Sequence, residues 1–308
     1  MTLTVEREGN KAVIGNEDAA ADVDTAPSRT TVTFLGTEAV VPMASGDTAS
    51  FVINGKYLVD TGWYAAIKMT GYGLDPLRLE YLFLTHCHHD HYLGLPHLLF
   101  YLAMRSSAAP RSERHPLKIV GPAPDVNRVV DLSKQFLQTE HFPAVRFDPQ
   151  VIALEAGQTL EDPRFRLETC SSLHPVPGLC YRMTDKETGV VIAFTGDTAY
   201  DPGIVRHVQG ASLLIHEASY GASPAPLANA SLHSGAPDAA RVAKEAGARR
   251  LALVHCARPD QPAALQAAQQ IFANTFWPAD GETVVLETWR GTETARSRGE
   301  QTGTVGVL

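Results

Sequence analysis

Short apolar runs bounded by glycine, proline and polar residues recur along the chain, and they predict β-strands. The first is "TVTFLG" (31–36), and "SFVINGKYLVDTG" (50–62) is typical of a hairpin because Asn54-Gly55 suits a type I′ turn. A buried strand is expected at "RLEYLFLTH" (78–86). Further strands are predicted near residues 117–121, 144–154, 164–174, 178–183, 190–195, 211–218, 249–255 and 282–289.

Apolar residues at helical spacing alternate with these strands. In "GLPHLLFYLAMR" (94–105) four leucines fall on one face, and helices are also expected at 125–138, 236–247 and 262–276. Mixed sheets with helices packed outside predict an α/β (α+β) layered fold. No internal repeat or linker is apparent, so we expect one catalytic domain over 31–290. A polar, loosely ordered leader (1–30) and a flexible C-terminal tail (291–308) would flank it.

Composition and charge narrow the function classes. The 308 residues include 26 Lys plus Arg and 34 Asp plus Glu, a net charge of −8, which argues against affinity based on phosphate-backbone neutralisation. No run of twenty apolar residues and no basic N-terminal region before an apolar run is present, so neither a membrane span nor a secretory signal is expected. Four cysteines without a C-x-x-C pair predict reduced thiols in a cytoplasmic protein, and indicate no thiolate zinc site.

The stretch "LTHCHHDHYLG" (84–94) concentrates ionisable side chains directly after a buried strand. Burying such a cluster is costly unless something pairs with it, and neutral imidazole and carboxylate groups suit zinc. In an extended segment His86 and His88 share a face, while Cys87 points to the other side. A tight turn after His88 would return Asp90 and His91 to the same place. His89 (in the same stretch) is expected to face solvent or to lie outside the coordination sphere.

Four side chains from one loop do not complete two tetrahedral sites, so further ligands must come from distant strands. His174, Asp197 and His255 each stand at the end of a predicted strand. The carboxyl ends of strands open onto one edge in α/β architectures, and functional side chains collect there. We therefore predict a metal site built from the loop and these three residues.

The motifs of this chain resemble those of the metallo-β-lactamase fold superfamily. "THCHHDH" matches its H-x-H-x-D-H signature, and "LVDTG", "SSLH", "FTGDT" and "LVHC" follow in the superfamily's order. The resemblance implies a four-layer αββα sandwich with two zinc ions at the sheet edge, manganese or iron being alternatives. It also implies a role for Asp60 in orienting a ligand histidine, although a plain turn aspartate is the other interpretation. By the same match, His86, His88 and His174 would hold the first ion, Asp90, His91 and His255 the second, and Asp197 would bridge them.

Further segments resemble the ribonuclease Z-like branch of the superfamily. These are "LHPVPGLCYRM", "LLIHEASY" and "ASLHSGAPDAARVAKEAGARRLALVH", although Glu38 stands where that branch usually has glycine. The resemblance implies that His233, paired with Glu217, protonates a leaving alkoxide, and it places Asp90 with them among the catalytic residues. The alternative is that Glu217 merely ends a strand and His233 neighbours a helix cap.

One departure from that branch bears on the substrate. The long basic arm that grips transfer RNA in many members would lie between Arg182 and Gly196, where this chain has only "MTDKETGVVIAFT". Structured tRNA is therefore an unlikely partner, and we predict a zinc phosphodiesterase acting on small or cyclic phosphodiesters through a metal-bridging hydroxide. Alternatives are a lactonase, β-lactamase or arylsulfatase, an RNA 3′-processing endonuclease, an iron oxidoreductase, or a non-catalytic binding protein. The resembled enzymes are commonly dimers, so a homodimer is an open option.

Overall fold

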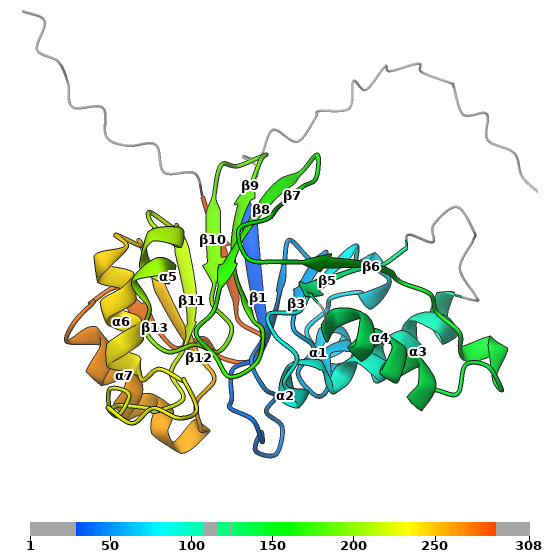
Figure 1. Cartoon of the computed structure of the whole chain (residues 1–308), viewed down its shortest axis with the longest axis horizontal. Helices are drawn as coiled ribbons and strands as arrows, with labels where there is room; N and C mark the ends of the chain where they lie inside the picture. The colour runs from blue at the N-terminus through cyan, green and yellow to red at the C-terminus, as the bar shows by residue number, and fades with distance from the viewer. Residues whose placement is uncertain (1–28, 107–115, 124, 288–308) are drawn as a thin grey trace, which may run out of the picture.

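Two seven-stranded sheets face each other, and helices cover the outer side of each (Figure 1). The computed structural model describes residues 29–106, 116–123 and 125–287. The predicted αββα sandwich is therefore confirmed. The predicted leader (1–30) and tail (291–308) fall almost entirely outside the described residues. No helix among the described residues has the length and apolarity needed to cross a membrane.

The first sheet is antiparallel on one side and parallel on the other, and its outer face is covered by three longer helices. In this sheet, neighbouring strands are antiparallel from β14 through β1 and β2 to β3, and parallel from β3 to β6. Its order is β14 (Thr283–Leu286), β1 (Thr30–Gly36), β2 (Ser50–Ile53), β3 (Tyr57–Val59), β4 (Tyr81–Phe83), β5 (Lys118–Pro122) and β6 (Gln150–Leu154), under α1 (Ala65–Gly71), α3 (Gly94–Ser106) and α4 (Asp125–Phe136).

The second sheet mirrors this arrangement. Its strands are parallel from β10 to β13 and antiparallel from β10 back to β7. The order is β13 (Thr275–Phe276), β12 (Leu251–Val254), β11 (Leu213–Glu217), β10 (Val191–Phe194), β9 (Leu179–Asp185), β8 (Phe165–Ser171) and β7 (Thr159–Glu161), under α5 (Pro202–His207), α6 (Ala236–Glu245) and α7 (Gln261–Gln269).

Aromatic side chains fill the space between the two sheets. Phe165 of β8 packs edge-on against Tyr57, Tyr81 and Phe83 of the first sheet, with ring centroids 5.1, 5.0 and 5.8 Å away. Phe194 of β10 packs in the same way against Phe51 at 5.6 Å, so both sheets contribute to one core. This apolar layer supports the edge at which the polar cluster lies.

Most predicted elements are found, and two predicted hairpins are confirmed. Asn54 and Gly55 have φ of 51° and 67°, as a type I′ turn requires. β9 and β10 are joined by the short turn 186–190, so this connection is the plain hairpin that the sequence predicts.

Three predicted boundaries are wrong. The strand predicted at 78–86 is confined to β4, because Pro76–Arg78 forms a 3-10 turn. The strand predicted at 144–154 begins only at Gln150, after a second such turn at Pro143–Val145. The helix predicted over 262–276 ends at Gln269, since Thr275 pairs with Leu251 in the sheet.

Candidate metal centre

The predicted ligand residues converge at the edge where strands of both sheets end. His86 follows β4, Asp197 follows β10 and His255 follows β12. The single turn α2 (His89–Tyr92) then reverses the chain, and it brings Asp90 and His91 back beside His86. Strand ends and one short helix thus collect side chains that are far apart in the sequence.

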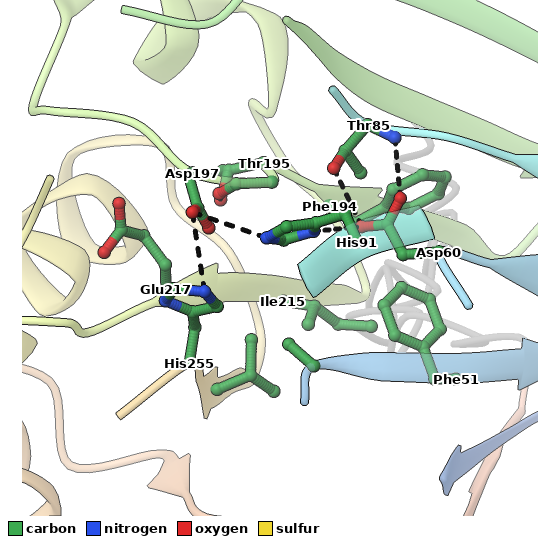
Figure 2. A pocket seen from close by; sticks show the side chains of 13 residues that line it. Phe51, Asp60, Thr85, His91, Phe194, Thr195, Asp197, Ile215, Glu217 and His255 are labelled. Atoms are coloured by element: carbon green, nitrogen blue, oxygen red, sulfur yellow. Dashed lines mark hydrogen bonds and ion pairs between the residues drawn. The ribbon is translucent and has the colours of Figure 1, made fainter. Parts of the chain in front are cut away.

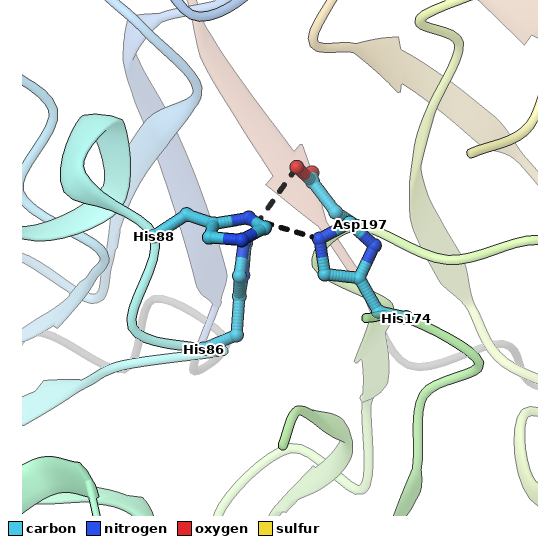
Figure 3. A group of neighbouring side chains, drawn as sticks. All are labelled: His86, His88, His174 and Asp197. Atoms are coloured by element: carbon cyan, nitrogen blue, oxygen red, sulfur yellow. Dashed lines mark hydrogen bonds and ion pairs between the residues drawn. The ribbon is translucent and has the colours of Figure 1, made fainter. Parts of the chain in front are cut away.

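A first group of four possible metal ligands consists of His86, His88, His174 and Asp197. Their ligand atoms all lie within 4.8 Å of one another. Nε2 of His174 is 3.0 Å from Nδ1 of His88, and Nε2 of His86 is 3.7 Å from Oδ2 of Asp197. Figure 3 shows the four side chains pointing toward one another. Three imidazoles and a carboxylate at this spacing form a suitable ligand set for zinc.

A second group lies directly beside the first and consists of Asp90, His91 and His255. Oδ2 of Asp90 is 3.1 Å from Nε2 of His255 and 3.4 Å from Nε2 of His91. Oδ2 of Asp197 is 3.4 Å from Nε2 of His91 and 3.5 Å from Nε2 of His255. Dashed lines in Figure 2 mark both contacts. Asp197 therefore lies between the two groups, in the position predicted for a shared ligand.

The carboxylates around His91 favour positive charge at this centre. Nδ1 of His91 is 2.8 Å from Oδ2 of Asp60, so a neutral ring turns the lone pair of its Nε2 toward the carboxylate of Asp197. Nε2 of His86 and of His91 is buried, without a hydrogen-bond partner in the described part of the chain. Burial lowers the pKa of His91, but Asp197 and Asp60 raise it well above its usual value. Metal ions would meet the same demand for positive charge, so the residues fit a metal centre.

Asp60 holds His91 from behind. Its carboxylate accepts hydrogen bonds from the backbone N–H of Thr85 at 2.8 Å and from the Thr85 hydroxyl at 2.8 Å, besides its contact with His91 (Figure 2). Such a partner fixes the orientation and tautomer of a ligand histidine. This geometry favours the orienting role over the plain turn aspartate.

Four residues around the centre adopt positive φ. They are Asp60 (50°), Gly196 (60°), Leu232 (52°) and His255 (60°). Positive φ is unfavourable for residues other than glycine, and it occurs where the surrounding structure over-determines the backbone, often at functional sites. A Cβ at Gly196 would lie 2.6 Å from Cβ of Thr85, so only glycine fits beside Asp197.

His233 and Glu217 form the predicted pair. Nδ1 of His233 is 2.8 Å from Oε1 of Glu217, whose carboxylate also accepts hydrogen bonds from the backbone N–H groups of Thr198 (2.8 Å) and Ser219 (3.1 Å). The side chain of Glu217 is 1% exposed and that of His233 20%. Burial lowers the pKa of His233, but the hydrogen bond and charge of Glu217 outweigh this effect and raise it. The ring of His233 stacks on that of His255, with centroids 5.7 Å apart.

Sequence reasoning missed Ser219, and it left two neighbouring residues out of the ligand set. The Ser219 hydroxyl lies 2.8 Å from Nδ1 of His255 and 3.2 Å from Nδ1 of His233, so it links a ligand candidate to the Glu217 pair. Its place two residues after Glu217 was the available signal. Cys87 packs against the apolar layer under α3, and His89 is exposed, so neither joins the ligand groups.

Comparison with known proteins identifies the family. The model of the β-lactamase superfamily domain matches residues 55–256, which include every predicted ligand. The chain belongs to the β-lactamase superfamily. The predicted superfamily resemblance is thereby confirmed, and the protein is a metal-dependent hydrolase of this superfamily.

Curated relatives within the superfamily share a name. Ribonuclease Z of Methanothermobacter thermautotrophicus is 27% identical, with 84% of this chain and 97% of the relative covered. Ribonuclease Z of Geobacillus kaustophilus is 26% identical over 80% of this chain and 96% of the relative. The ribonuclease Z-like resemblance of the sequence is thus matched over nearly the full length of these proteins.

Solved structures of superfamily members share the fold. The metallo-β-lactamase fold protein YhfI from Bacillus subtilis superposes with a TM-score of 0.69 at 24% identity, covering 84% of this chain and all of YhfI. The short form of human tRNase Z gives 0.67 at 24% identity, covering 82% and 98%. A diphosphatase of the PhnP family gives 0.62 at 17% identity, covering 85% and 98%. These likenesses support the same αββα arrangement.

Proposed function

We propose that the protein is a phosphodiesterase with two metal ions that cleaves small or cyclic phosphodiesters, with His233 as general acid. The observation that carries the proposal is the partly buried hydrogen bond of 2.8 Å between Nδ1 of His233 and Oε1 of Glu217, directly beside the ligand groups. An alkoxide is a poor leaving group and needs a proton, whereas opening a strained lactam or lactone does not require one at this position.

The two ligand groups support the positions proposed for the metal ions. His86, His88 and His174 would hold one ion, and Asp90, His91 and His255 the other, with Asp197 shared between them. Zinc is our choice because neutral imidazole and carboxylate ligands suit it, manganese and iron being the alternatives. When bound, such ions supply Lewis-acid stabilisation of phosphoryl oxygens and activation of water near neutral pH. Asp90 would be both a metal ligand and a catalytic residue. Its Oδ2 lies 3.1 Å from Nε2 of His255, a ligand candidate of the same group.

His233 supplies the proton in this proposal. Because Glu217 engages Nδ1, Nε2 is the nitrogen left to donate to the leaving oxygen. Glu217 in turn is held by two backbone N–H groups, so the imidazole is positioned before substrate arrives. The 20% exposure of the His233 side chain then allows water to return a proton after each turnover.

The scaffold favours a small substrate. The β9–β10 connection is too short to contain an RNA-binding arm, and the net charge of the chain is −8. Affinity for structured RNA depends on cationic groups that follow its backbone. RNA 3′-end processing is the second candidate, since the curated relatives named ribonuclease Z match over nearly their whole length.

A substrate panel with metal-replete enzyme tests the proposal. We expect kcat/KM for bis(p-nitrophenyl) phosphate and for nucleoside 2′,3′-cyclic phosphates to exceed that for lactones, β-lactams and aryl sulfates. Precursor tRNA should not be cut specifically at its 3′ side at low enzyme concentration. A preferred lactone or sulfate ester would overturn the phosphodiesterase assignment, and specific tRNA cleavage would favour the second candidate.

We further propose a cytoplasmic homodimer. All four cysteines are free thiols, which suits a reducing compartment. Phe100 of α3 and Leu132 and Phe136 of α4 are 42%, 45% and 76% exposed around one apolar groove, a feature typical of protein contacts. Light scattering should give twice the chain mass, and Phe136→Glu should give the monomer; a wild-type monomer would contradict the proposal.

A further inference from the structure

A second cluster of metal-ligand side chains lies away from the candidate metal centre. Cys170 of β8 and Cys180 of β9 are direct cross-strand partners, and His207 ends α5 above them. The ligand atoms of the three lie within 4.8 Å of one another. Both cysteines lie on the helix-covered face of the second sheet, and none of the three residues belongs to the two groups described above.

Within the described ranges, one ring nitrogen of His207 lacks a partner that would account for its burial. Its Nε2 is buried and has no hydrogen-bond partner among residues that the structure describes. Leaving a buried polar atom unpaired costs about 1–3 kcal/mol. An imidazole beside two thiols is a combination of ligands that suits zinc.

Neighbouring contacts hold the three side chains in place. Arg182 of β9 donates from Nη1 to the carbonyl of Gln209 at 2.8 Å and to that of His207 at 3.5 Å, which ties the end of α5 to the sheet. At the other end of α5, Asp201 accepts a hydrogen bond from the N–H of Gly203. The cysteines are fixed by the seven-residue pairing of β8 with β9, so the cluster is assembled before any ion arrives.

We propose that Cys170, Cys180 and His207 bind a thiophilic divalent cation, Zn²⁺ by chemistry, at a site separate from the hydrolytic centre. Binding would release the two thiol protons to solvent and leave two thiolates and one imidazole on the ion, with water completing a tetrahedron. The ten-residue separation of the cysteines resembles no zinc-binding spacing, which is why the sequence indicated no thiolate site. A Cys170–Cys180 disulfide is the rival, but it would leave Nε2 of His207 unpaired.

Cobalt substitution of the full chain separates the two centres. All ligand candidates of the hydrolytic centre offer nitrogen or oxygen, so sulfur-to-cobalt charge-transfer absorption reports only the proposed site. We expect this near-ultraviolet band in the reduced wild type, its loss in Cys170→Ser, and weaker Co²⁺ binding in His207→Gln. Cys87→Ala and His97→Gln are matched controls, since both positions are half-buried outside the cluster, and both should retain the band.

A measurement on the wild type guards against variants that fail to fold. Cys170 is partly exposed, so iodoacetamide should alkylate it in metal-free protein. Zn²⁺ should protect it, a chelator should restore alkylation, and His207→Gln should weaken the protection. No cobalt–thiolate band, a band that survives Cys170→Ser, or absence of Zn²⁺ protection would each overturn the proposal. A Cys170–Cys180 disulfide in protein kept under reducing conditions would do the same.

Discussion

At the scale of single residues, groups outside the two ligand groups hold the candidate ligands in their orientation. Asp60 acts through His91: it receives two hydrogen bonds from Thr85 and a third contact from Nδ1 of His91. Ser219 stands in the same relation to His255, with its hydroxyl 2.8 Å from Nδ1. In both cases the far nitrogen of the imidazole faces the carboxylate of Asp197.

Asp60→Ala therefore should weaken metal binding more than it disturbs the fold elsewhere. Losing such an orienting partner typically costs about 10–100-fold in metal affinity. Chelator competition measures this affinity, and Asp148→Ala, at a surface aspartate remote from the centre, is the control. If Asp60→Ala lowered the melting temperature but left metal affinity intact, Asp60 would be only a turn residue.

The side chains that the motifs single out are brought together, whereas some supporting contacts were invisible in the sequence. The spacing of residues within "THCHHDH" and the predicted strand ends indicated the ligand candidates. Both can be derived from the pattern of apolar and polar residues along the chain. Ser219 and Asp47 escaped notice. Asp47 accepts hydrogen bonds from the backbone N–H groups of Trp63 and Tyr64 at 2.8 and 2.9 Å, and such contacts depend on how distant loops meet.

At the scale of elements, the connection after β10 sets the position of Asp197. Gly196 has φ of 60°, and a Cβ there would lie 2.6 Å from Cβ of Thr85 at the end of β4. Two strand ends, one from each sheet, thus meet in contact just before Asp197, the proposed shared ligand. The centre depends on this close approach.

Gly196→Ala should separate the two strand ends. The left-handed backbone costs a residue with a side chain about 1–2 kcal/mol, and the overpacking adds about 1–3 kcal/mol. Gly210→Ala is the matched control, because its φ is 67° but its Cβ would meet no atom within 4 Å. In urea unfolding, Gly196→Ala should lose more stability than Gly210→Ala. Metal analysis should also find less bound metal in Gly196→Ala. Equal effects in both variants would remove the steric argument.

Helices and strands were predictable where the apolar pattern is long. The predictions failed where pairing with a distant strand determines the structure of a segment. α3 and α6 were expected because apolar residues recur along one face. The helix predicted over 262–276 was too long, because Thr275–Phe276 pairs with β12 even though local spacing continues the helical pattern. α5, only Pro202–His207, is too short to show a period, and so the His207 cluster could not be foreseen.

At the scale of the whole molecule, one aromatic core joins the two sheets. The layered fold was predictable from the alternation of strands and helices. The order of strands within each sheet was not, because pairing between β14 and β1 joins the two ends of the described chain. Phe165 is fully buried and reaches three aromatic rings of the opposite sheet.

Phe165→Ala should accordingly lower the free energy of unfolding by about 3–5 kcal/mol, as expected for an aromatic side chain lost from a core. Phe142→Ala removes the same group from a position that is 57% exposed, and it should change stability by less than about 0.5 kcal/mol. Chemical denaturation measures both. Similar losses would mean that the space between the sheets is not the stabilising core.

The dependence of His233→Ala on the leaving group tests the central claim most directly. An alkyl or ribose alkoxide needs a proton, whereas p-nitrophenolate hardly does, and general acid catalysis contributes about 10²–10⁴-fold. The account predicts a loss of that order on alkyl or ribose phosphodiesters, a much smaller loss on p-nitrophenyl diesters, and unchanged metal content. Glu217→Gln should show the same pattern more mildly, since Glu217 only orients and charges the imidazole. Equal losses for both leaving groups would contradict the general-acid role and the preference for phosphodiesters.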